Sequence, residues 1–132
     1  MLSSLRRWYH DWVTHDDRVL DRIFEGRALL SDDEFYRRYF PDGSVLKEVA
    51  IGIRDTFIEH VPLDMRRLAP DDNFGRELQF VWSHDSLADV ELILAVEKKF
   101  AVSINEAEAQ ATLTMGALIR LVDWKVKARR NA

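Results

Sequence analysis

The chain has 132 residues, of which 47% are hydrophobic and 32% charged, and it contains no cysteine. This length favours one domain with a modest core, and the lack of cysteine excludes disulfide scaffolds, thiolate metal sites and cysteine nucleophiles. A net charge of −4 argues against sequence-independent nucleic-acid binding, which needs a basic face. No apolar run reaches the roughly 18 residues of a membrane span and the start lacks a signal-peptide core, so we expect a cytoplasmic protein.

The beginning of the chain, residues 1–42, reads as a helical extension rich in aromatic residues. A helix is predicted from about 16 to 25, where Gly26 stops it, and Ser31 with Glu34 forms a capping box for the next helix. The aromatic residues are Trp8, Tyr9, Trp12, Phe24, Phe35, Tyr36, Tyr39 and Phe40. We expect these rings to pack on the rest of the protein; the alternative is that the extension docks a partner enzyme or forms a homodimer.

A longer helix is predicted between Ser44, which can cap it, and Pro62, which ends it. Its core stripe consists of Leu46, Val49, Ile53 and Phe57. From Leu63 to His84 the helical period is lost, which predicts a loop with at most a turn or two of helix. Loops of this length inside compact domains tend to be functional.

The next predicted helix, from His84 to Phe100, has two apolar faces. The first is a core stripe of Leu92, Ile93, Val96 and Phe100. The second, on roughly the opposite side, consists of Leu87, Val90 and Leu94. Either the helix is buried on both sides, or the second stripe joins Glu91 in an outward docking surface beside the Ser86 hydroxyl. The spacing alone does not separate these interpretations.

Two further helices are predicted near the end of the chain. Asn105 and Glu108 form a second capping box for a short helix, and Thr114 can cap the last one. Its inward-facing residues are Leu118, Leu121 and Val122. The basic tail, residues 126–132, is expected to be a solvated helix end, where cations suit the negative end of the helix dipole.

The Asp85-Ser86-Leu87 tripeptide, followed by Val90-Glu91-Leu92 and closed by Phe100, resembles the second helix of acyl carrier proteins. The likeness continues without a gap into the family's third and fourth helices. The residues that carry it there are Ile104, Glu106, Glu108, Ala109, Thr114, Ala117, Ile119 and Val122. Upstream, residues 46–61 resemble the first helix. The resemblance implies an all-α fold in which residues 43–125 form a four-helix acyl-carrier-like bundle after the extension.

By this resemblance, a phosphopantetheinyl transferase attaches 4′-phosphopantetheine to Ser86, and the terminal thiol of the arm carries an acyl group as a thioester. A phosphodiester suits a helix start because free backbone N–H groups and the helix dipole favour negative charge there, although helix capping alone would also explain Ser86 or Asp85. The resemblance gives Asp85 a role in orienting the transferase's magnesium ion. The implied partner-binding residues are Asp85, Leu87, Val90, Glu91 and Leu94.

The chain departs from the family at two places. Lys98 and Lys99 reverse two charges near the lower docking surface, which indicates partners other than those of a generic fatty-acid carrier. The link from 79 to 84 is longer and aromatic, and Ser83 replaces the usual glycine. Its apolar residues are expected either to enter the core or to shield the arm or an acyl chain. They are Phe80, Val81 and Trp82.

The expected function is that of a specialised acyl carrier in lipid or polyketide biosynthesis, whose partners are acyl-transferring or acyl-activating enzymes. The alternative is a protein-interaction module that keeps the carrier fold and is never modified. An enzyme is not expected, because the adjacent His84, Asp85 and Ser86 cannot adopt the geometry of a hydrolase triad. No metal-ligand spacing and no glycine-rich phosphate loop is present.

Overall fold

The structure is a computed structural model in which residues 17–83 and 88–131 are described. Residues 17–23 are helical. The later helices are α2 (Asp32–Tyr39), α3 (Lys47–His60), α4 (Phe80–Ser83), α5 (Ala88–Phe100), α6 (Glu106–Ala111) and α7 (Met115–Arg130). These residues contain no β-strand; one isolated bridge joins Asn73 to Thr114. The prediction of an all-α protein is therefore confirmed at the level of fold class.

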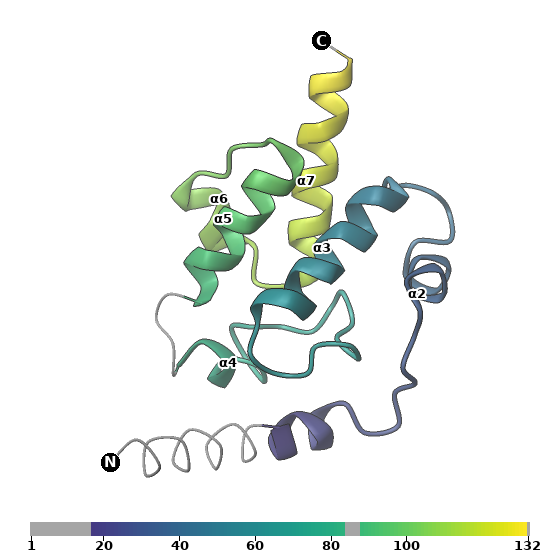
Figure 1. Cartoon of the computed structure of the whole chain (residues 1–132), viewed down its shortest axis with the longest axis vertical. Coiled ribbons are helices and arrows are strands. Elements are labelled where there is room, and N and C mark those ends of the chain that lie inside the picture. Colours follow the sequence, from purple (N-terminus) through teal and green to yellow (C-terminus); the bar gives the residue numbers. More distant parts are fainter. Residues whose placement is uncertain (1–16, 84–87, 132) are drawn as a thin grey trace.

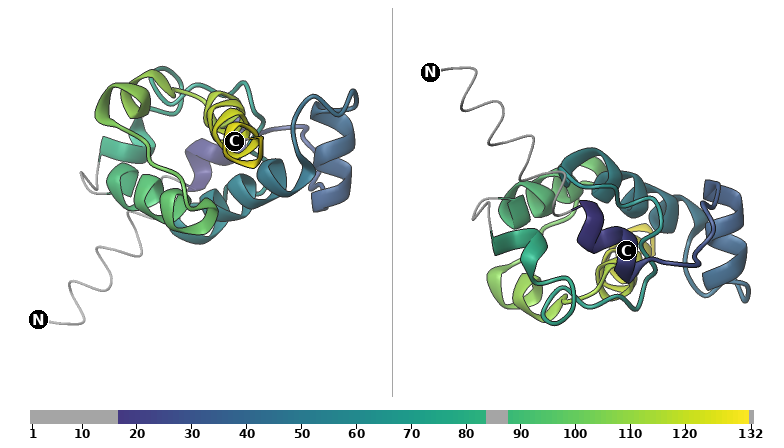
Figure 2. Two further views of the ribbon diagram at one scale, coloured as in Figure 1. Left: turned by 90° about the horizontal axis from the view of Figure 1, so that it is seen from above. Right: turned by 90° about the horizontal axis from the view of Figure 1, so that it is seen from below.

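Helix α3 is the element on which the others pack. It contacts α5, α7 and α2, and Figure 1 shows it crossing the molecule between them. Gly52 allows α5 to come close, because a Cβ atom at this position would lie 2.5 Å from the ring of Phe100. Seen from above and below, α2 lies at one end of the molecule and α6 at the other (Figure 2). The two ends of α3 thus meet different surroundings.

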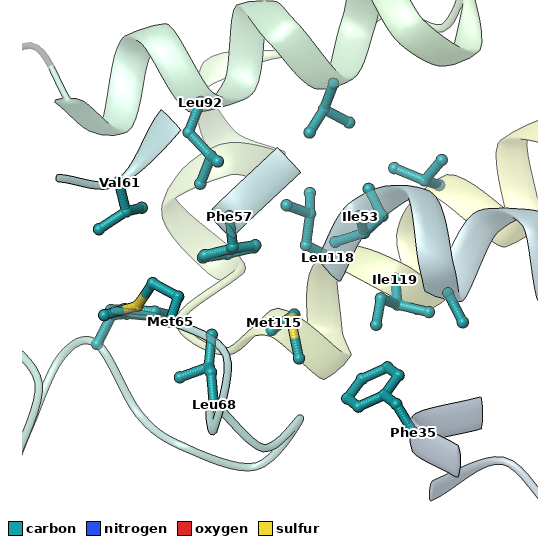
Figure 3. Close-up of a cluster of buried hydrophobic side chains, with 14 of the residues drawn as sticks. Phe35, Ile53, Phe57, Val61, Met65, Leu68, Leu92, Met115, Leu118 and Ile119 are labelled. Carbon is teal, nitrogen blue, oxygen red and sulfur yellow. The ribbon is translucent and has the colours of Figure 1, made fainter. Parts of the chain in front are cut away.

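The hydrophobic core forms where α3, α5 and α7 meet. Figure 3 shows Phe57, Leu92 and Leu118 pointing toward one another from these three helices. Met65 and Leu68 add the irregular segment after α3 to the same cluster, and both are buried. Among the described residues, no helix is long and apolar enough to cross a bilayer.

The described part of the extension, residues 17–42, belongs to this core. Its buried members are Leu20, Phe24, Phe35 and Phe40, none more than 3% exposed. For the five described aromatic residues, this packing agrees with the first of the two interpretations; Trp8, Tyr9 and Trp12 lie outside the described residues. Whether the extension also contacts a partner stays a prediction.

A buried arginine of α3 fastens the extension to the body. The side chain of Arg54 donates to a carboxylate oxygen of Asp32 at 2.7 Å and to the backbone carbonyl of Leu30 at 2.7 Å. It also reaches the carbonyl of Arg66 at 3.2 Å, and its guanidinium lies 5.2 Å from the ring centroid of Phe35. One side chain therefore joins three segments that are distant in the sequence.

A second ion pair joins the extension to the long irregular segment. The Arg27 guanidinium binds both carboxylate oxygens of buried Asp72, at 2.5 and 2.9 Å. Asp72 also accepts a hydrogen bond from the backbone N–H of Ala69 at 2.7 Å. The pKa of the Arg27 guanidinium is raised above its ordinary value, and the hydrogen bond to Asp72 is the largest cause. The bidentate geometry holds the segment in place against the extension.

Most of the predicted helix caps are confirmed. Both capping boxes form, Ser31 with Glu34 and Asn105 with Glu108, and Thr114 caps α7. The prediction that Ser44 caps α3 is wrong: the N-cap residue is Leu46, with no side-chain cap of its own.

A distant carboxylate replaces the predicted serine. The backbone N–H of Leu46 donates to Asp123 of α7 at 2.8 Å, whereas the N–H of Ser44 turns back to Asp42 at 3.1 Å. Asp123 is buried, so this contact is shielded from water. The start of α3 is thus held by α7 and not by its own preceding residues.

Helix α7 extends past the predicted end of the bundle, to Arg130. Val126 is buried, and Arg129 donates to the carbonyls of Phe100 and Ala101 at 2.8 and 2.7 Å. Arg130 pairs with Glu48 at 2.7 Å. The basic tail, predicted to be a solvated helix end, is therefore bound back to the body as far as Arg130.

Candidate functional site

The predicted attachment residue is outside the described part of the chain. Asp85, Ser86 and Leu87 all fall in the segment between α4 and α5, residues 84–87, which the structure leaves undescribed. The other predicted partner-binding residues, Val90, Glu91 and Leu94, lie on α5. The geometry of the site is therefore built from α5 and its neighbours.

The two apolar stripes of α5 have different fates. In the core stripe, Leu92 and Val96 are buried, at 4% and 0% exposure. In the second stripe, Val90 is 50% exposed and Leu94 58% exposed, and Glu91 between them is exposed too. The interpretation of a helix buried on both sides is therefore wrong for these residues, and Val90 and Leu94, the described part of the second stripe, face solvent.

Beside this exposed stripe lies an apolar cavity of about 650 Å³. It lies between α5, α6 and the link to α7, and its volume is within the roughly 300–1,000 Å³ of small-molecule sites. Its apolar lining includes Phe57, Phe74, Trp82, Leu92, Ile104 and Leu118. Sequence periodicity did not predict this cavity, because its lining residues come from several helices and irregular segments that are separate in the sequence.

Among the described residues, three of the five large exposed apolar side chains lie around the same cavity. Val90 and Leu94 line it from α5, and Leu113, which is 49% exposed, lines it from the link between α6 and α7. The other large exposed apolar residues among those described, Leu29 and Trp124, do not line it. Clustered apolar surface of this kind marks a binding site, whereas single exposed residues are ordinary.

One wall of the cavity is aromatic, and we call Phe57, Phe74 and Trp82 the aromatic wall. The rings of Phe57 and Phe74 are stacked, with centroids 5.5 Å apart and planes 17° apart. Those of Phe74 and Trp82 are 5.0 Å apart and inclined by 40°. The three rings therefore support one another as a continuous surface.

The aromatic wall is tied to the opposite rim through the backbone. The N–H of Phe74 donates to the carbonyl of Leu113 at 2.8 Å, next to the bridge between Asn73 and Thr114. The Leu113 side chain lies over Gly75, where a Cβ atom would meet it at 3.4 Å. The long segment after α3 and the link before α7 thus form one joined wall.

The polar groups that line the cavity already have partners within the chain. Glu97 accepts a hydrogen bond from the N–H of Ile104 at 2.9 Å, and Asn105 accepts one from Glu108 at 2.8 Å. The Thr114 hydroxyl accepts one from Ala117 at 3.0 Å. An apolar group could therefore enter without leaving these groups unsatisfied.

The charge of the lining is one-sided. Asp89, Glu97 and Glu106 contribute carboxylates, and none of the described lining residues is Lys, Arg or His. The lysines that follow on α5, Lys98 and Lys99, are exposed and do not line the cavity. An anionic ligand is consequently disfavoured in this cavity.

Helix α6, which covers one side of the cavity, is held mainly at its start. Glu108 accepts from the backbone of Asn105 at 3.0 Å and pairs with Lys125 of α7 at 2.9 Å. These two contacts, in that order, hold the pKa of Glu108 below its ordinary value. No residue of α6 is fully buried, although Ala109 packs against the core, so these polar contacts add to a small apolar contact in holding the helix.

The aromatic link gave the only sequence signal for the cavity wall. Of its residues, Val81 is buried in the core, and half-buried Trp82 lines the cavity. Sequence reasoning missed Phe74 and Leu113, which show no helical period.

No protein-family model matches the chain. Among the described residues, no group of three or more His, Cys, Asp or Glu side chains could hold a metal ion.

Proposed function

We propose that the protein is a specialised acyl carrier, which holds acyl groups as thioesters on a 4′-phosphopantetheine arm attached to Ser86 and presents them to partner enzymes. The observation that carries this proposal is that the exposed stripe and the apolar cavity share helix α5. In the sequence, Ser86 precedes the first residue of α5, Ala88, by two positions.

The order of the elements supports the proposal. A long helix (α3), an irregular segment, the helix after the serine (α5), a short helix (α6) and a final long helix (α7) follow one another as in a four-helix carrier bundle. The packing of α3 against both α5 and α7 agrees with this arrangement.

The cavity supplies a physical reason for the thioester chemistry. An acyl group on a thioester is neutral, so the carboxylates of the lining do not repel it as they would a free fatty acid. Burial of its apolar part stabilises the loaded protein by about 0.8 kcal/mol per methylene group. Inside the cavity, the acyl group would be shielded from water between encounters with partner enzymes.

The exposed residues of α5 supply a docking surface for those partners. Val90 and Leu94 would contribute apolar contact area, and Glu91 would pair with a basic patch on the partner. Leu113 extends this apolar surface beyond the residues that the sequence indicated. The partners would be a phosphopantetheinyl transferase, with Asp85 and Leu87 at its contact, and enzymes that transfer or activate acyl groups.

The second candidate is an interaction module with the carrier fold that is never modified. The exposure of Val90 and Leu94 favours it as much as it favours the carrier, because an apolar docking surface needs no prosthetic arm. The two candidates differ only in the chemistry at Ser86.

Modification of Ser86 tests this difference. The chain would be co-expressed with a broad-specificity phosphopantetheinyl transferase and its intact mass measured. We expect an increase equal to one phosphopantetheine, lost in Ser86→Ala and retained in Ser103→Ala, a matched control at an exposed serine. A folded chain that gains no mass with several transferases would contradict the carrier and leave the interaction module.

A further inference from the structure

We propose that the cavity beside α5 selects a neutral group that carries an aromatic ring, and that Trp82 and Phe74 determine this selectivity. The statement that such a group arrives as part of an acyl thioester rests on the proposed function. The binding of the group by the cavity does not, because every residue that carries the inference is described independently of Ser86.

The first step is the shape of the aromatic wall. Phe74 packs against Phe57, with nearly parallel rings, and against Trp82, whose ring is inclined by 40°, so each ring of the wall is supported by a neighbour. Phe57 and Phe74 are also buried, at 3% and 6% exposure. Trp82 is only half-buried and lines the cavity, so it is the ring of the wall on which a bound planar ring gains stacking contacts beyond its burial, with Phe74 supporting it from behind.

The second step is the entropy of the bound group. A straight alkyl chain has a rotatable bond at every carbon, and each one that is frozen in the cavity opposes binding. A ring of similar apolar content has none within it. Against a wall that does not adapt its shape, the ring therefore has the advantage.

The third step is charge. Three carboxylates and, among the described lining residues, no basic side chain surround the cavity. Glu97 and Asp89 each accept a backbone hydrogen bond, from Ile104 at 2.9 Å and from Val90 at 2.8 Å, which keeps them in use within the chain. A neutral ligand leaves these contacts intact, whereas the carboxylates repel an anion. A cation gains attraction from the carboxylates but loses its hydration in the apolar cavity, so it is not expected to bind more tightly than a neutral group.

Free alcohols test the inference without any modification of the protein. The affinities of 3-phenylpropan-1-ol and hexan-1-ol, which partition similarly between water and octanol, would be measured by NMR titration of the amides of α5 and α6. We expect the aromatic alcohol to bind about two- to tenfold more tightly, the factor that one aromatic contact provides. Equal affinities, or no binding of either alcohol, would overturn the inference.

Variants of the wall locate the selectivity. Trp82 is half-buried, so Trp82→Leu is expected to fold, with its circular dichroism as the check, and to bring the affinity ratio close to one. Trp82→Phe should keep the preference. Leu113→Ala, a change at the cavity rim, should weaken both alcohols by the same factor. If the affinity ratio of the two alcohols is unchanged in both Trp82→Leu and Phe74→Leu, the role of the aromatic wall is refuted.

Charged analogues test the requirement for a neutral group. 3-Phenylpropanoate should bind more weakly than the alcohol, and 3-phenylpropylamine no more tightly; a tighter amine would mean that the site selects cations. These results are separable from the proposed function. If the alcohols bind with the expected affinity ratio but no transferase modifies Ser86, the carrier alone is refuted. If Ser86 is modified but the affinity ratio of the two alcohols is one, the ring selectivity alone is refuted.

Discussion

The two ends of the molecule treat their apolar side chains in opposite ways. At the end that carries α2, Phe35 and Phe40 are 1% and 3% exposed (Figure 2). At the end that carries α6, Leu94 and Leu113 remain 58% and 49% exposed beside an open cavity. The first end is packed as a core is packed, whereas the second leaves apolar surface that a ligand or partner could cover.

Charged side chains follow the same division. Where the extension meets the body, Arg54 and Arg27 pair with Asp32 and Asp72 and reach backbone carbonyls as well. Around the cavity, carboxylates gather without a basic residue among the described lining. The comparison indicates that the extension contributes to the packed core, and that the surface proposed for binding lies at the opposite end.

The largest effect is expected at the packed end. Phe35→Ala removes a fully buried ring that contacts Tyr39, Phe40 and the Arg54 guanidinium. The free energy of unfolding should fall by about 3–5 kcal/mol, the usual cost of deleting a buried phenylalanine. Urea denaturation followed by circular dichroism measures it. A loss below about 1 kcal/mol would show that the extension does not stabilise the fold.

An intermediate effect is expected from acid, and it should separate the two capping boxes. Glu34 in α2 and Glu108 in α6 both have a lowered pKa, caused first by the backbone hydrogen bonds of Ser31 and Asn105. A carboxylate whose pKa is lowered by folding stabilises the fold above its unfolded pKa, here 4.5, and this contribution is lost as the pH falls through the folded value.

The prediction concerns the amide exchange protection factors of the two helices as the pH is lowered from 6 to about 3. Helix α6 has no buried residue and should lose protection, whereas α2 should keep it because Phe35 remains buried. Glu108→Gln should make the protection of α6 low and independent of pH. Equal loss in both helices would contradict the comparison.

The smallest effect on stability is expected at the exposed stripe. Leu94→Ala should change the free energy of unfolding by no more than about 0.5 kcal/mol, because the side chain is mostly in solvent. The same variant should lower the kcat/KM of the transferase for Ser86 several-fold. Trp124→Ala, at a residue 66% exposed away from the cavity, is the matched control and should leave kcat/KM unchanged.

The sequence predicted best what depends on neighbouring residues. The capping boxes at Ser31 and Asn105 and the cap at Thr114 each join atoms three residues apart, so the sequence pattern contains both partners. The two stripes of α5 were also visible as spacing. Which stripe was buried depended on where α3 lay, and spacing does not contain that information.

The sequence failed where a distant residue took over a local role. The start of α3, which Ser44 was predicted to cap, is held by Asp123, 77 positions from Leu46 in the sequence. Arg54 binds Asp32, which precedes α3 in the sequence, and Arg66, which follows it. The cavity is a further case, because Phe74 and Leu113 become neighbours only through the bridge between their segments. Candidate binding residues on irregular segments therefore could not be predicted from the spacing of residues in the sequence.

The contacts of Arg129 set a practical limit on how the protein can be handled. Ala101, which follows α5, has a left-handed conformation (φ 52°). Arg129 donates hydrogen bonds to the carbonyls of Ala101 and Phe100. A shortened version that stops at Trp124 would strip the far end of α5 of this donor. A fluorescent protein or affinity tag at the C-terminal end should therefore be joined after Arg130. If Arg129 were removed, the end of α5 would fray, and measurements on the exposed stripe would be made on a disturbed helix.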